Sequence, residues 1–221
     1  MAETRLIYFG DPMCSWCYGF LPVIGALADQ FEGRLPVEVI MGGLRAANTQ
    51  PMRPKDKDYI RETWTQVEAT TGQPFDMSFL DRESFTYDTE PACRAVVTAR
   101  RMLPHMALPF MARIQQAFYA ENRDITSASE IADIADEAGF HRAEFSSAFA
   151  SPEVQNETFR DFLIAQELGI RGFPTLIGGS EDKGYALVTN GYRPLEDLAE
   201  PLEHWLEAGA PVTKEQSPQL H

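Results

Sequence analysis

The chain has 221 residues, of which 44% are hydrophobic and 24% are charged, as in an ordinary folded globular protein. Its 33 Asp and Glu residues against 19 Lys and Arg give a formal net charge of -14, which would repel nucleic acid and anionic lipid surfaces. The longest apolar runs fall far short of the ~20 residues of a membrane span. Composition therefore argues against nucleic-acid and membrane partners.

The N-terminus runs directly into a short apolar segment and a pair of cysteines. A secretory signal peptide needs a longer apolar region and a cleavage site with small residues, so we expect a cytoplasmic protein. Lasting disulfides are rare in the reducing cytosol. The three cysteines, Cys14, Cys17 and Cys93, are too few for a disulfide scaffold, and the Cys-x-x-Cys pair indicates redox or metal chemistry.

The first forty or so residues predict a strand, a helix and a second strand. Residues 5–10 form a β-branched and aromatic run that is typical of a buried strand. From Cys14 onward apolar residues recur at helical spacing, so the two cysteines open an amphipathic helix. Residues 37–41 form another apolar strand, which ends at Gly42 and Gly43. This order predicts a right-handed β-α-β unit with parallel strands.

The middle of the chain predicts helices only. Residues 44–58 are polar and contain prolines, which indicates a linker leading out of the sheet. The segment that follows shows only helical periods. One helix opens with Ser127 and Glu130 at capping-box spacing, and another has Pro152 in its first turn. These features predict an inserted all-helical domain.

The sheet resumes near the C-terminus. Residues 174–177 predict a strand, 178–184 a turn, 185–188 an antiparallel strand and 194–208 a closing helix. The complete order predicts an α/β protein with the thioredoxin fold and an inserted helical domain. The expected limits are residues 1–50 and 165–210 for the thioredoxin-like domain, 51–164 for the insertion and 211–221 for a flexible tail.

The motif Cys14-Ser15-Trp16-Cys17 carries the most specific chemistry. Two residues between cysteines at a helix start allow a disulfide to form with little backbone movement. The unpaired amides of the first helical turn should point at the Cys14 sulfur and favour its thiolate. We therefore expect Cys14 to attack a substrate disulfide and Cys17 to resolve the mixed disulfide. The redox centre would be the Cys14–Cys17 disulfide, without a further cofactor.

Other interpretations of the cysteines stay open at this point. A structural zinc site needs four ligands, and besides Cys93 the chain offers only scattered histidines that are not paired at ligand spacing, so we expect no metal. Cys93 is either a small buried hydrophobe or a second redox thiol. Asp11 would raise the pKa of the Cys14 thiol if its carboxylate approached the sulfur.

Residues 11–20, 89–95 and 172–175 together resemble the DsbA family of thioredoxin-like proteins, in particular its FrnE-like cytosolic branch of predicted disulfide isomerases. The resemblance spans roughly residues 5–207. It implies that Pro174 is a cis-proline facing the redox cysteines, and that an extended substrate segment pairs with the preceding backbone. The implied substrate contacts are Trp16, Tyr18, Phe173 and Thr175, with simple core packing as the alternative for the aromatic residues.

The resemblance implies a thiol-disulfide oxidoreductase or isomerase that acts on protein or small-molecule thiols and disulfides, with glutathione as a possible co-substrate. The expected cytosolic setting favours reduction or reshuffling over oxidation. A glutathione-dependent transferase or isomerase of the same fold is one alternative, although such enzymes typically use a serine without a paired cysteine. A chaperone or binding module is another. The sequence does not determine the oligomeric state.

Overall fold

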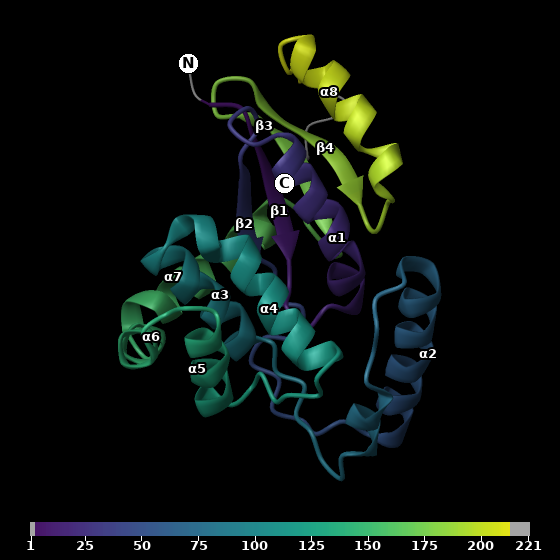
Figure 1. The fold of residues 1–221 in the computed structure, drawn as a ribbon, viewed down its shortest axis with the longest axis vertical. Helices are drawn as coiled ribbons and strands as arrows, with labels where there is room; N and C mark the ends of the chain where they lie inside the picture. The colour runs from purple at the N-terminus through teal and green to yellow at the C-terminus, as the bar shows by residue number, and fades with distance from the viewer. Residues whose placement is uncertain (1–2, 213–221) are drawn as a thin grey trace.

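The computed structural model describes residues 3–212, so residues 213–221 of the predicted tail lie outside it. Its centre is a four-stranded sheet in the order β2-β1-β3-β4, with helices on both faces (Figure 1). β1 pairs in parallel with β2 and antiparallel with β3, and β3 pairs antiparallel with β4. The strands are Arg5–Gly10 (β1), Val37–Met41 (β2), Thr175–Ser180 (β3) and Gly184–Asn190 (β4).

Side chains of β1 point alternately into two hydrophobic cores, because successive side chains of a strand point to opposite faces of the sheet. Leu6 and Tyr8 are fully buried in the main core, which includes α1 (Ser15–Gln30). Phe9 points the other way and packs with Ala165 of α7 (Pro152–Glu167). The closing helix α8 (Ala199–Glu207) belongs to the main core, through Leu202. This arrangement confirms the predicted α/β thioredoxin-like order.

The strand β3 is longer than predicted, and the predicted turn over residues 178–184 is wrong for its first half. β3 continues to Ser180, and only residues 181–183 connect it to β4. The glycines that suggested a turn are explained by the packing of β3 against β4. A Cβ atom on Gly179 would lie 2.0 Å from the backbone oxygen of Gly184, so glycine permits close approach of two paired strands.

All the α-helices of the described chain between β2 and β3 fall in the predicted insertion or at its end. After α2 they gather beside β2, whereas α2 stands apart from them, next to the start of α1 (Figure 1). No helix within residues 3–212 has the length and apolar composition needed to cross a bilayer. The helices not yet given are Pro54–Thr71 (α2), Glu90–Met102 (α3), Ala107–Tyr119 (α4), Ala128–Glu137 (α5) and Arg142–Phe149 (α6).

The start of α2 corrects the predicted linker over residues 44–58. The helix begins at Pro54, where the fixed φ of proline suits the first helical position. The Asp56 carboxylate accepts a hydrogen bond from the backbone N–H of Arg53 at 2.9 Å, which satisfies a donor at the helix start. The linker is therefore shorter than its polar composition suggested.

The inserted helices share one continuous hydrophobic core with the sheet. Trp64 of α2, Val96 of α3 and Phe118 of α4 belong to the same buried cluster as Leu6 and Leu27. α1 contacts both α2 and α4. The helices therefore support the side of α1 that carries the cysteines.

β2 is an edge strand that pairs with another strand on one side only. Side chains from two helices form hydrogen bonds with the backbone groups of its free edge. Arg100 of α3 donates a hydrogen bond to the Val39 carbonyl at 2.7 Å, and Asp161 of α7 accepts one from the Met41 N–H at 2.9 Å. The two side chains also form an ion pair at 2.8 Å. The Asp161 side chain is only 4% exposed, so its charge depends on Arg100.

Replacing Arg100 by Met should leave the buried Asp161 carboxylate without its partner. We expect the free energy of unfolding to fall by about 3 kcal/mol at neutral pH, as for broken buried ion pairs. Burial already raises the pKa of Asp161, and Arg100 opposes that rise. Its loss would move the folded-state pKa further above the unfolded value of about 3.9, so stability is lost as pH rises between the two values.

The check is urea unfolding of Arg100→Met near neutral pH and at about pH 3, where most of Asp161 is protonated in both states. The deficit should be largest near neutral pH. Arg101→Met is the matched control, because Arg101 is 52% exposed and pairs with Glu157 at 3.1 Å, and it should cost less than about 1 kcal/mol. An equal deficit of Arg100→Met at both pH values would contradict this account.

Candidate active site

The turn between β1 and α1 places Cys14 at the N-cap of the helix. Its backbone N–H donates to the Asp11 carbonyl at 3.0 Å, and its carbonyl accepts from the Tyr18 N–H at 3.0 Å. The thiol makes no side-chain capping bond to the first turn, contrary to the sequence-based expectation. It lies 3.5 Å from the Phe173 carbonyl oxygen instead, as a hydrogen-bond donor. The hydrogen-bond acceptor for the Cys14 thiol therefore comes from a loop that is distant in sequence.

The two thiols of the motif differ in accessibility. Both are free thiols, with Cys14 7% exposed and Cys17 fully buried one turn further along α1. Burial raises the pKa of the Cys17 thiol well above its usual value, and the adjacent Cys14 sulfur adds to the rise. Cys17 is therefore held as a neutral thiol, whereas Cys14 is the sulfur that an incoming molecule can reach.

The loop before β3 faces the cysteines, as the resemblance implied. The Phe173–Pro174 peptide bond is cis, and the Phe173 carbonyl is the acceptor for Cys14. Thr175 is only 2% exposed, and its hydroxyl donates to the Gly172 carbonyl at 2.8 Å. The same hydroxyl lies 3.2 Å from the Asn190 side-chain oxygen. Thr175 therefore ties the loop to β4 and does not line the site.

Two glycines after β2 let aromatic side chains pack against the backbone beside this loop. A Cβ atom on Gly42 would lie 2.1 Å from the Phe173 ring, and one on Gly43 would lie 2.7 Å from the Phe162 ring. Gly43 also has a φ of 64°, which favours glycine. The glycines that ended the predicted strand thus fix where Phe173 can sit.

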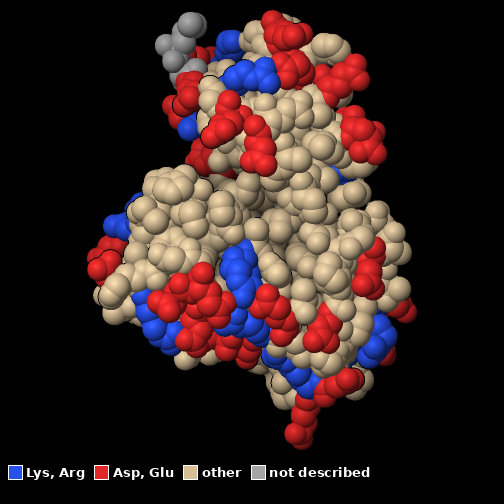
Figure 2. Space-filling view, in the orientation of Figure 1, with Lys and Arg blue, Asp and Glu red and all other residues tan. Residues whose placement is uncertain are grey.

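A cleft of about 270 Å³ opens beside Cys14, with α2 as its far wall. Trp16 and Phe173 line it, as predicted, together with Leu44, Arg45 and Tyr59, which the sequence analysis missed. The adjoining recess, formed largely by residues 45–53, has a volume of about 800 Å³ and shares Arg45 with the cleft. On the face shown in Figure 2, a broad band without charged residues separates the charged upper and lower parts of the molecule.

Tyr18 is not brought to the cleft. It is 3% exposed, its ring stacks on Tyr119 at 4.8 Å, and its hydroxyl donates to the Pro74 carbonyl at 3.2 Å. Tyr18 lies four residues after Cys14, and α1 turns it toward the inserted helices and away from the cleft. The packing alternative describes Tyr18, whereas Trp16 is half-buried at the cleft and contacts Tyr192.

The buried carboxylate of Asp11 stabilises the turn between β1 and α1 through hydrogen bonds. Asp11 is fully buried and accepts hydrogen bonds from the backbone N–H groups of Met13 at 2.8 Å and Leu44 at 2.7 Å. Burial raises the pKa of Asp11, and these two donors oppose the rise. The carboxylate is thus occupied by backbone amides, and within residues 3–212 it forms no hydrogen bond with the Cys14 thiol.

Cys93 of α3 completes the environment of Asp11. It is fully buried, as one of the two interpretations predicted, and its thiol lies 3.4 Å from a carboxylate oxygen of Asp11. Burial raises the pKa of the Cys93 thiol well above its usual value, and the Asp11 charge adds to this. Cys93 is therefore a neutral hydrogen-bond donor. Within residues 3–212 no group of three or more His, Cys, Asp or Glu residues is arranged to hold a metal ion.

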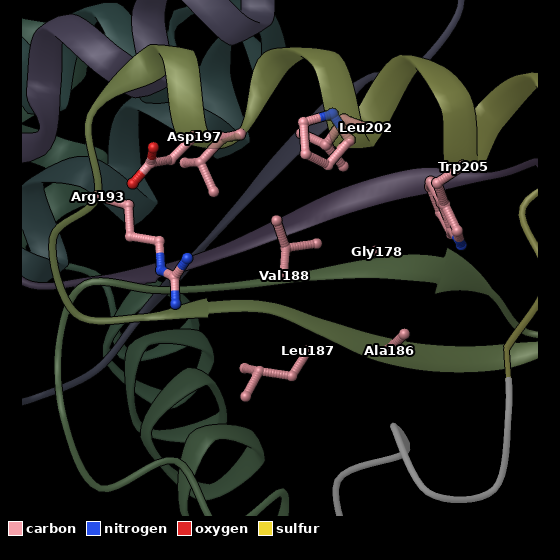
Figure 3. A pocket seen from close by; sticks show the side chains of 10 residues that line it. Gly178, Ala186, Leu187, Val188, Arg193, Asp197, Leu202 and Trp205 are labelled. Carbon is pink, nitrogen blue, oxygen red and sulfur yellow. The ribbon is translucent and has the colours of Figure 1, made fainter.

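A second cavity lies on another part of the sheet. It has a volume of about 310 Å³ and lies between α8 and the β3–β4 pair, with Val188 and Trp205 directed into it and Leu187 directed away (Figure 3). None of the three cysteines lines it. The chemistry of the cysteines therefore belongs to the cleft beside Cys14.

Comparison with known proteins agrees with this geometry. Residues 5–203 match the family described as the DSBA-like thioredoxin domain. A structure of a proposed protein disulfide isomerase from Nitrosomonas europaea is 37% identical, with a TM-score of 0.87, over 93% of this chain and 98% of that one. The cytosolic disulfide reductase DsbM from Pseudomonas aeruginosa is 28% identical, with a TM-score of 0.76, over 92% and 99% of the two chains.

More distant curated relatives include the ClpXP adapter protein SpxH of Bacillus subtilis, which is 21% identical over 173 residues. That match covers 78% of this chain and 57% of the adapter, so the chain spans little more than half the length of the curated relatives it matches. The family match, by contrast, covers nearly all of the chain and includes both the cysteine motif and the cis-proline loop. The chain therefore belongs to the family of DSBA-like thioredoxin domains.

Proposed function

We propose that the chain is a thiol-disulfide oxidoreductase in which Cys14 attacks a substrate disulfide and Cys17 resolves the mixed disulfide. The observation that carries this proposal is the asymmetry of the pair: Cys14 borders an open cleft, and Cys17 lies buried next to it. The paired thiol also favours disulfide exchange over the transferase alternative, since transfer to an electrophile needs no second sulfur.

The reaction consists of two exchanges of sulfur–sulfur bonds. The Cys14 thiolate bonds to one sulfur of the substrate disulfide, and the other sulfur leaves as a thiolate. Cys17 then loses its proton and bonds to Cys14, which releases the second substrate thiol. The substrate gains two electrons and the enzyme holds a Cys14–Cys17 disulfide. A thiol reductant must reduce that disulfide before the next turnover.

The cis-proline loop would hold an extended substrate during the first exchange. In the free enzyme the Phe173 carbonyl accepts a hydrogen bond from the Cys14 thiol. Once Cys14 is in a mixed disulfide it has no proton to donate, so this carbonyl becomes available to a backbone N–H of the substrate. Main-chain pairing of this kind binds a peptide with little dependence on its sequence.

We place the enzyme in a reducing compartment and propose net reduction as its direction. Supporting this, the 28% identical protein from Pseudomonas aeruginosa is named a cytosolic disulfide reductase. A reducing glutathione pool would keep the Cys14–Cys17 pair as dithiol between turnovers.

Serine substitutions separate the two roles. Cys14→Ser should abolish turnover, because it removes the attacking sulfur. Cys17→Ser should retain attack and accumulate a covalent adduct between Cys14 and the substrate. The measurement is insulin disulfide reduction together with non-reducing electrophoresis and intact mass. Equal loss of activity in both variants without any adduct would contradict the assignment.

Alkylation of the native protein provides an independent check. With limiting iodoacetamide followed by peptide mass mapping, Cys14 should react first, because it borders the cleft. Cys17 and Cys93 are fully buried neutral thiols and should react only after unfolding in urea. Rapid native labelling of Cys93 would reopen its interpretation as a second redox thiol.

Glutathione is the reductant that we propose, and Arg45 is the residue that would recognise it. Arg45 lines the cleft with Cys14, and its guanidinium group lies 5.1 Å from the centre of the Tyr87 ring. Within the described chain its guanidinium forms no ion pair or hydrogen bond, and no Asp or Glu lines the cleft. A structure of the Pseudomonas aeruginosa reductase contains glutathione, which supports this proposal.

Arg45→Gln should therefore impair the use of anionic thiols. A charge-assisted hydrogen bond is worth about 1.5–3 kcal/mol, so KM for glutathione should rise at least about tenfold. Turnover with the neutral thiol 2-mercaptoethanol should change little. Arg53→Gln is the control, since Arg53 lines only the recess and is paired with Asp56 at 2.9 Å. An equal effect on both thiols would refute recognition of charge by Arg45.

A further inference from the structure

One buried polar group near the cysteines takes no part in the proposed exchange reaction. Tyr8 of β1 is fully buried in the main core, and its hydroxyl has no hydrogen-bond partner of normal geometry within residues 3–212. An unsatisfied buried hydroxyl is destabilising relative to a phenyl ring of the same shape. A core position of this kind would be better filled by phenylalanine unless the hydroxyl acts in another state of the protein.

The hydroxyl and the resolving thiol lie close enough to influence each other's charge. Tyr8 of β1 and Cys17 of α1 are buried in the same core, where the Cys17 sulfur raises the pKa of Tyr8 and the Tyr8 hydroxyl lowers the pKa of Cys17. The Tyr8 ring packs against Phe20, one turn after Cys17, with ring centres 6.0 Å apart. The position of the ring is thus fixed by the same helix that carries the sulfur.

Gly10 provides the space that the hydroxyl occupies. A Cβ atom on Gly10 would lie 2.9 Å from the Tyr8 hydroxyl oxygen and equally close to the terminal methyl group of Met111. A larger residue at position 10 would displace the hydroxyl. The backbone of β1 and Met111 of α4 therefore limit where the hydroxyl can lie.

We propose that the Tyr8 hydroxyl donates a hydrogen bond to the Cys17 sulfur as that sulfur becomes a thiolate during resolution of the mixed disulfide. The inference rests on the proposed function and adds a residue to it. The hydroxyl is unsatisfied in the dithiol form because a neutral thiol is a weak acceptor, and it gains a strong acceptor only when charge develops on the sulfur.

The step is balanced without a further reactant. The Cys17 S–H bond breaks, the Cys17 sulfur bonds to the Cys14 sulfur, and the bond from Cys14 to the substrate breaks. The released substrate thiolate takes up one proton, which replaces the proton lost by Cys17. Tyr8 keeps its proton throughout, because burial and the neighbouring sulfurs raise its pKa well above the usual value.

Two other polar groups near the cysteines are engaged in hydrogen bonds of their own, whereas within the described chain the Tyr8 hydroxyl is not. The Asp11 carboxylate is occupied by the Met13 and Leu44 amides and by the Cys93 thiol. The hydroxyl of Tyr87 donates to the Met13 carbonyl at 2.5 Å. The backbone amide of Asp11 also lowers the pKa of the Cys17 thiol and would assist. The remaining titratable groups nearby are the Cys14 thiol and Tyr119, which packs among the rings of α1 and α2.

The test is Tyr8→Phe, which removes only the hydroxyl. A mixed disulfide of Cys14 with glutathione is formed first, and release of glutathione is then followed in a single turnover. We expect release to be slowed about tenfold or more, because a hydrogen bond to a charged group is lost. Its pH profile should move to higher pH, since the Cys17 thiolate is less favoured. Attack by Cys14, measured in a Cys17→Ser background, should change less than about twofold.

Tyr119→Phe is the matched control, because its hydroxyl is also buried without a partner of normal geometry in the described chain. It should release glutathione at the wild-type rate. Gly10→Ala is a second test variant, which keeps the hydroxyl but displaces it, and it should be slow in the same way. Urea unfolding identifies a variant that has lost its fold.

Wild-type release and an unshifted pH profile in folded Tyr8→Phe would overturn the inference. Slow release in both Tyr8→Phe and Tyr119→Phe would also overturn it, as a general packing effect. If wild-type protein forms no mixed disulfide on Cys14, the proposed function itself fails, and this outcome is seen before any Tyr8 variant is needed.

Discussion

The hydrogen bonds of the buried Asp11 carboxylate join the three segments from which the active site is built. One oxygen accepts the Met13 amide in the cysteine turn, and the other accepts the Leu44 amide in the loop after β2 and the Cys93 thiol of α3. A buried carboxylate is costly unless such donors surround it. The donors come from the sheet and from the insertion, so the cysteine turn is correctly placed only when both parts have assembled.

The inserted helices contribute to the site as much as the sheet does. α2 forms the far wall of the cleft through Tyr59 and Ile60, and its Trp64 lies in the core shared with the sheet. Arg45 comes from the loop that leads toward the insertion, and it is the charged residue that lines the cleft. A protein with a net charge of -14 thus offers a cationic side chain in the same cleft as Cys14. This contrast favours anionic thiols near Cys14 by simple electrostatics.

Much of the site was predictable because its residues are tied to local patterns. The Cys-x-x-Cys spacing at a helix start and the Gly-Phe-Pro-Thr segment before a strand each depend on short-range geometry, and the structure brings them together through the bond between Cys14 and Phe173. The family resemblance implied that Tyr18 and Thr175 contact the substrate. The helical turn directs Tyr18 inward, and the Thr175 hydroxyl is used to hold its own loop.

The sequence by itself determined the order of strands and helices, the burial of β1, and the position of the Cys14 and Cys17 pair at the start of a helix, because these follow from local periodicity and residue type. Only the tertiary structure decided which distant groups meet them. Three features depend on how the sheet, α1 and the insertion pack. The Asp11 carboxylate accepts the Leu44 amide, Arg45 lines the cleft, and the Tyr8 hydroxyl is buried in the same core as Cys17. Such contacts carry no periodic signal, because they join residues that are far apart or on different elements of the chain.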